Sequence, residues 1–153
     1  MNFPVADLHC DLLSFLAKIP KADPFDPTQI PCAFPWLKAG GVRAQVLAIY
    51  TDVHPESMEL ASRQADLFVK LLEDHPETVC RWDADFQQKL EATEQLGIIA
   101  SIENSAGIGT PTATWTEIYA QFDALLEKVG SLAYISLTHH TENRFGGGNY
   151  TDG

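Results

Sequence analysis

The sequence predicts an α/β fold in which a parallel sheet forms the first half of a (β/α)₈ barrel. Short apolar runs alternate with helical segments along the 153 residues, an order that favours a parallel sheet with right-handed crossovers. An open doubly wound sheet begins in the same order. However, chemically able polar residues follow three of the apolar runs, and barrel enzymes gather such residues at the C-terminal ends of their strands. Since a closed barrel takes about 250 residues, we expect a barrel truncated after about four strands.

Apolar runs define the strands, since strands buried on both faces read as nearly continuous apolar segments. The second run is entered through a Gly40-Gly41 turn, and the third opens after Gly97. The predicted strands are 3–9, 42–50, 98–103 and 132–137.

Four segments are predicted to be helices: 11–18, 55–74, 83–95 and 115–129. In the second, apolar residues recur at spacings of three and four, with charged residues on the other side. Thr114 and Glu117 offer a capping box for the last helix, and Gly130 ends it. Residues 20–35 hold five of the nine prolines and are expected to form an irregular loop.

Composition indicates one incomplete soluble domain spanning 1–153. Ten Lys and Arg against 21 Asp and Glu give a net charge of −11, which argues against a nucleic-acid or anionic-membrane partner. No apolar run approaches the roughly 18 residues of a membrane span, and the N-terminus lacks the basic start of a signal peptide. Cys10, Cys32 and Cys80 match no disulfide framework, so we expect free thiols and a cytoplasmic location.

The most informative stretch is Asp7-Leu8-His9-Cys10-Asp11. In a strand, alternate residues share a face, so Asp7, His9 and Asp11 are expected to point together into the barrel while Cys10 points away. An imidazole and carboxylates are suitable zinc ligands. The alternative is a helix N-terminus, with Asp11 as its cap and His9 as a structural histidine.

Two further strand ends carry candidate residues. Glu103 ends an apolar run, where a carboxylate can bind a cation, bridge two metals or act as a base; alternatively it tops the strand in solvent or pairs with a lysine. His139 and His140 follow the last run. Adjacent residues of an extended segment face opposite ways, so one is expected to polarise a substrate carbonyl while the other lies on the surface. An ordinary pair of strand-end histidines is the alternative.

Four segments, in order, resemble the membrane (renal) dipeptidase family, the M19 metallopeptidases. They are spread over nearly the whole chain, and together they are fairly specific although each is short. The segments are VADLHCDL at 5–12, GGVRAQ at 40–45, IASIEN at 99–104 and YISLTH at 134–139, the last followed by Asn143.

The resemblance implies a TIM-like barrel of the metal-dependent hydrolase type that cleaves small dipeptides with two zinc ions. It implies that His9 and Asp11 bind the first zinc, that Glu103 bridges both, and that His139 contacts the substrate or the tetrahedral intermediate. Asp7 has no ligand role in that pattern and is expected to orient His9. Family members are often dimers, so the full-length form is expected to be a homodimer.

The resemblance also implies that parts of the site are missing. The family's two second-zinc histidines and its acid/base aspartate lie further along the chain, so the 153-residue chain is expected to be an inactive fragment. Two positions depart from the family pattern: Cys10 replaces the usual Asn, and Glu103-Asn104-Ser105 replaces the frequent Glu-Gly-Gly. Two other functions stay open, namely another metal-dependent amidohydrolase, although those more often begin with His-x-His, and a metal-free acidic binding module.

Overall fold

The apolar runs form a curled parallel sheet of five strands in the computed structural model, which describes residues 4–151. Phe3, the expected first residue of the first strand, lies outside the described residues. Four of the strands match the four that were predicted, with ends shifted by at most two residues. The strands are β1 (Val5–Cys10), β2 (Val42–Tyr50), β3 (Val79–Arg81), β4 (Leu96–Glu103) and β5 (Leu132–Ser136).

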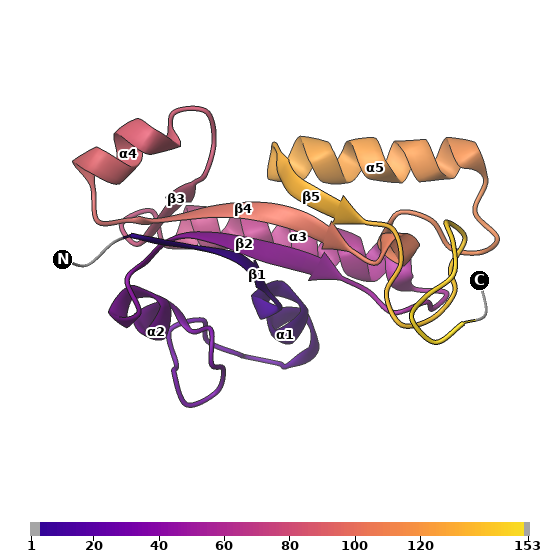
Figure 1. Cartoon of the computed structure of the whole chain (residues 1–153), viewed down its shortest axis with the longest axis horizontal. Coiled ribbons are helices and arrows are strands. Elements are labelled where there is room, and N and C mark those ends of the chain that lie inside the picture. The colour runs from indigo at the N-terminus through magenta and orange to yellow at the C-terminus, as the bar shows by residue number, and fades with distance from the viewer. Residues whose placement is uncertain (1–3, 152–153) are drawn as a thin grey trace.

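Strand β4 is the centre of the sheet. It pairs with β2 along one edge, while β3 pairs with its beginning and β5 with its end on the other edge. β1 lies on the far side of β2, so the four longer strands follow one another in the order β1-β2-β4-β5. This parallel order and the curl of the sheet (Figure 1) confirm the predicted fold class, the N-terminal half of a TIM-like barrel. β3, with three residues, was not predicted.

Helices fill the connections between the strands. The four predicted helices are present, and a further one, α2, follows the proline-rich loop with Pro35 in its first turn, where a missing N–H costs little. Among the helices of residues 4–151, none is both long and apolar enough to cross a membrane. The α-helices are α1 (Leu12–Lys18), α2 (Phe34–Ala39), α3 (Ser57–Asp74), α4 (Phe86–Ala92) and α5 (Trp115–Val129), and Ser105–Gly107 form the 3₁₀ helix η1.

The core lies between one face of the sheet and α1, α3 and α5, with α3 packed between the other two (Figure 1). Alternate residues of β4 (Ile98, Ala100 and Ile102) are buried in this core with Phe68 of α3. Because side chains alternate along a strand, the residues between them, ending at Glu103, face the other, concave side of the sheet. The packing therefore decides which side chains can form a site.

Helix α5 has the bounds predicted from its caps. Thr114 accepts a hydrogen bond from the backbone N–H of Glu117, and the Glu117 carboxylate accepts one from the backbone N–H of Thr114. The hydrogen bonds that the Glu117 carboxylate accepts from the backbone N–H and the hydroxyl of Thr114 hold its pKa below the ordinary value. Gly130 ends the helix with a φ of 81°, a backbone conformation that favours glycine.

Gly97 is expected to be intolerant of a side chain. A Cβ at this position would overlap Cε2 and Cζ of the Phe86 ring, by which α4 packs on β4. Gly97→Ala should lower the free energy of unfolding by about 1–3 kcal/mol through overpacking, measured by urea denaturation. In a Phe86→Leu background the same change should cost clearly less. An equal cost in both backgrounds would contradict this explanation.

Candidate metal centre

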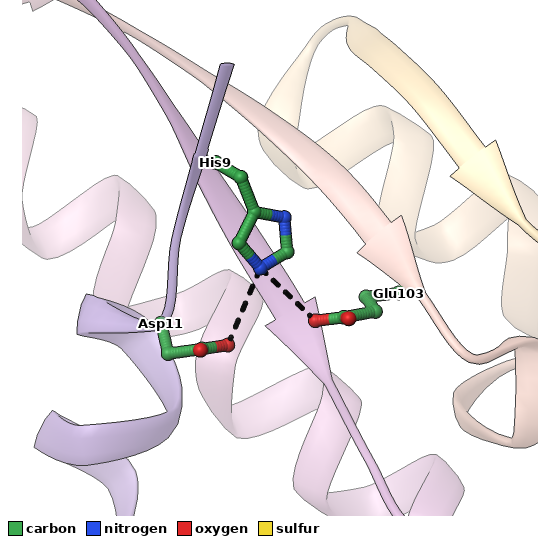
Figure 2. A group of neighbouring side chains, drawn as sticks. All are labelled: His9, Asp11 and Glu103. Carbon is green, nitrogen blue, oxygen red and sulfur yellow. Dashed lines mark ion pairs between the residues drawn. The ribbon is translucent and has the colours of Figure 1, made fainter. Parts of the chain in front are cut away.

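The concave face brings together three strand-end side chains that are far apart in the sequence. Nε2 of His9 lies 3.3 Å from Oε2 of Glu103 and 3.8 Å from Oδ1 of Asp11. One ligand atom from each of the three residues lies within 4.8 Å of those of the others. Figure 2 shows the imidazole of His9 pointing between the two carboxylates.

Sheet register sets the position of Glu103. β4 pairs with β2 from Gly97 to Glu103 without interruption, and this places Glu103 opposite Tyr50, the last residue of β2. Its neighbour Ile102 is buried among the helices, so the Glu103 side chain, 16% exposed, must point to the concave face. A buried strand that ends in a carboxylate therefore delivers that carboxylate to the rim.

Asp11 reaches the site by a different route from the one predicted. β1 ends at Cys10, and Asp11 is the N-cap residue of α1, with φ −91° and ψ 25°. The expectation that Asp7, His9 and Asp11 share one strand face is wrong in this respect, because the strand stops one residue early and its register shifts after Asp7. The Asp11 side chain makes no capping hydrogen bond. Its carboxylate is instead turned toward His9.

Asp7 does not orient the His9 ring, contrary to expectation. Its carboxylate accepts a hydrogen bond from the backbone N–H of His9 at 3.0 Å. The ring atom Nδ1 lies 2.6 Å from the hydroxyl of Tyr134, a residue of β5 that the sequence analysis did not single out. The spacing gave one indication, because Tyr134 lies two residues before Ser136 and the two therefore share a face of β5. Ser136 pairs with Glu103, so the Tyr134 side chain lies on the same face of the sheet as the Glu103 side chain.

Cys10 points away from the candidate ligands, as predicted. It is buried with the core residues, and a hydrogen bond to the Cys32 thiol together with burial raises its pKa. Its thiol stays protonated and takes no part in the cluster of His9, Asp11 and Glu103.

His139 contacts the other carboxylate oxygen of Glu103. Its Nε2 is 3.4 Å from Oε1 of Glu103, whereas His9 faces Oε2, so the two histidines flank one carboxylate. The expectation that His139 and His140 face opposite ways is wrong: their ring centroids are 3.8 Å apart. The reason is that β5 ends at Ser136, so the histidines lie in a loop rather than an extended strand.

The rings of Tyr50 and His139 pack in a T-shaped arrangement, with their centroids 5.3 Å apart. Burial raises the pKa of the Tyr50 hydroxyl above its ordinary value, and the hydrogen bond that it donates to Asp52 raises it further. The carboxylates of Asp52, Glu103 and Asp11 act in the same direction. The hydroxyl therefore stays protonated, and Tyr50 supports the His139 ring rather than acting as a base.

The loop after Glu103 explains one departure from the family pattern. Asn104 has a φ of 64°, in the region that favours glycine and that Asn tolerates better than most residues. Its side-chain oxygen accepts hydrogen bonds from the backbone N–H of Ala106 and, at 2.7 Å, from the amide of Asn143. Asn143 also donates to the carbonyl of Leu137. These bonds tie the loop after Glu103 to the loop that carries His139.

The donor set fits zinc. An imidazole nitrogen and two carboxylate oxygens are ordinary zinc ligands, and two ligands of a tetrahedral zinc lie about 3.3–3.6 Å apart. The His9–Glu103 separation of 3.3 Å matches this range. The His9–Asp11 separation of 3.8 Å and the 4.8 Å within which all three ligand atoms lie are longer than this range, and the Asp11 side chain, 61% exposed, has room to turn inward.

A parallel half-barrel with a histidine and two carboxylates at the C-terminal ends of its strands has the arrangement of TIM-like barrel proteins, in which polar residues gather at that end of the strands. Comparison with known families identifies the family. The family described as membrane dipeptidase (peptidase family M19) matches residues 1–152, and the chain belongs to this family. A comparison with curated protein sequences found no match.

We expect Asn104 to be needed both for its backbone conformation and for its side chain. Asn104→Ala should lower the free energy of unfolding by about 2–4 kcal/mol, because Ala at positive φ is strained and the Asn143 amide loses a partner. Asn104→Gly relieves the strain and should cost about 1–2 kcal/mol less. Urea denaturation of both variants measures this. Equal destabilisation by Ala and Gly would show that the backbone conformation is not the reason for Asn at this position.

Proposed function

We propose that the chain supplies the strand-end ligands of a zinc-dependent dipeptidase, with His9, Asp11 and Glu103 as metal ligands and His139 as a substrate contact. Membership of the membrane dipeptidase family gives the class of reaction. The observation that supports the site is the convergence of the three ligand atoms within 4.8 Å. The substrate is a small dipeptide, and the complete enzyme carries two zinc ions.

Glu103 is suited to bridge two metal positions. Its Oε2 contacts His9 and its Oε1 contacts His139, so the two oxygens are directed toward different residues. When bound, zinc at such a centre lowers the pKa of a water toward neutrality and polarises the scissile carbonyl. Glu103 is the last residue of the buried strand β4, which fixes the position of its carboxylate. His9 and Asp11 are the other ligands of the first zinc.

His139 is suited to contact the reacting carbonyl. Its Nε2 lies beside Glu103, and its ring packs between Tyr50 and His140. A ring held in this way can donate a hydrogen bond to the oxygen on which negative charge develops during hydrolysis. His139 thus acts on the substrate, while Glu103 and His9 hold the metal.

The described residues bring together one group of three candidate ligands. We therefore expect the 153-residue chain to bind a single zinc ion weakly and to hydrolyse dipeptides slowly or not at all. A cytoplasmic location and a homodimeric full-length form complete the proposal.

Zinc binding should depend on Glu103. In calorimetric titrations of the chain with Zn²⁺, Glu103→Gln should weaken binding by more than the roughly 10- to 100-fold that is typical of the loss of an outer-shell partner, because a direct ligand is lost. Glu127→Gln, the same change at an exposed position of α5, is the matched control and should bind like the unaltered chain. Equal zinc affinity of the Glu103 variant and the control would sink the proposed site.

Dipeptide hydrolysis should depend on His139 in any longer form of this protein that is active. His139→Ala should lower kcat by about 10²–10³-fold with zinc present, as for loss of one hydrogen-bond donor to a developing oxyanion. His75→Ala, at the C-terminal end of α3, is the control and should retain activity. Unchanged kcat in the His139 variant, or rapid turnover by the 153-residue chain alone, would contradict the assignment.

A further inference from the structure

Tyr134 makes a contact that crosses the concave face of the sheet. Its hydroxyl lies 2.6 Å from Nδ1 of His9 and donates a hydrogen bond to the backbone carbonyl of Leu8 at 3.2 Å. Tyr134 belongs to β5 and both partners belong to β1, and the sheet places β2 and β4 between these strands. The contact is possible because the sheet curls. It joins the two outer barrel strands of the described chain at the height of the candidate ligands.

One arrangement of the protons satisfies Tyr134, Leu8 and His9 together. A carbonyl oxygen can only accept, so the hydrogen bond between Tyr134 and Leu8 requires the single hydroxyl proton of Tyr134. The Tyr134 oxygen then acts as an acceptor toward its other partner among the described residues, Nδ1 of His9 at 2.6 Å, and in this arrangement Nδ1 carries the proton and donates it. This arrangement satisfies all three groups, and it places the proton of the neutral His9 ring on Nδ1.

The lone pair of His9 is then on Nε2, the atom that faces the two carboxylates. Nε2 lies 3.3 Å from an oxygen of Glu103 and 3.8 Å from one of Asp11. Three acceptors that face one another repel unless a positive charge lies between them. A metal ion placed among the three satisfies all of them at once.

We infer that Tyr134 is a positioning residue for the metal centre, whose hydroxyl holds the His9 ring with Nδ1 protonated and the Nε2 lone pair directed at the ligand position. The inference rests on the proposed function, since it assigns a role toward the same metal. Ligating histidines commonly donate their other ring N–H to a neighbouring acceptor, which sets the tautomer and the ring orientation. Here the acceptor is a tyrosine on the opposite strand of the half-barrel.

The opposite tautomer makes a different prediction. If Tyr134 donated to Nδ1 instead, the carbonyl of Leu8 would lose this partner, and Nε2 of His9 would carry the proton and donate it to Glu103. A ring in that state has no lone pair for a metal at Nε2. The two arrangements therefore differ in one measurable proton position.

The test combines two measurements on the 153-residue chain. Titration with Zn²⁺ should give about 10- to 100-fold weaker binding for Tyr134→Phe. Tyr119→Phe removes a hydroxyl from a tyrosine of α5 that is 63% exposed, and it should bind zinc like the unaltered chain. ¹⁵N NMR of histidine-labelled, metal-free protein, at a pH where the ring is neutral, should find His9 protonated on Nδ1 in the unaltered chain. In Tyr134→Phe the population protonated on Nε2 should rise.

Tyr134→Phe keeps the aromatic ring and removes only the hydroxyl with its two hydrogen bonds. Should Tyr134→Phe nevertheless fail to fold, the tautomer of His9 in the unaltered chain decides the matter. The inference is overturned if that ring is protonated on Nε2, or if Tyr134→Phe binds zinc like the control. If zinc affinity falls in Glu103→Gln but not in Tyr134→Phe, only the role of Tyr134 is wrong, whereas unchanged affinity in both removes the metal site itself.

Discussion

The uninterrupted parallel pairing of β2 with β4 is the constraint on which the rest of the site depends. It aligns seven residue pairs, from Ala44 with Gly97 to Tyr50 with Glu103. Because side chains alternate along a strand, a slip of one residue would turn Glu103 into the helix layer and bring Ile102 to the rim. The apolar side chains packed against α3 and α5 prevent that slip. The geometry of the candidate metal centre is thus a consequence of core packing.

A histidine and two carboxylates gather at this rim. Asp11 occupies an N-cap position and yet leaves the helix uncapped, with its carboxylate turned to His9. Asn104 holds a positive φ, a conformation that costs free energy and that its bonds to Asn143 offset. Both features cost local stability near Glu103, and such costs are typical of functional sites. We propose that a cation bound among His9, Asp11 and Glu103 accounts for both features.

The sequence predicted the elements that long-range packing confirms, and it missed those that only packing creates. Apolar runs located the four longer strands, and the caps located α5 to the residue. β3 has three residues and exists because it pairs with the start of β4, which no local pattern reveals. The site followed the same division: strand-end position identified His9 and Glu103, whereas the turn of Asp11 and the reach of Tyr134 depend on where β1 stops and how strongly the sheet curls.

Anomalous diffraction from crystals of the chain grown with zinc tests the central claim most directly, because it locates the ion without reference to activity. The account predicts a peak about 2.0–2.2 Å from Nε2 of His9 and from one carboxylate oxygen each of Asp11 and Glu103. Zinc peaks confined to other parts of the surface, with these three side chains diverging, would contradict it.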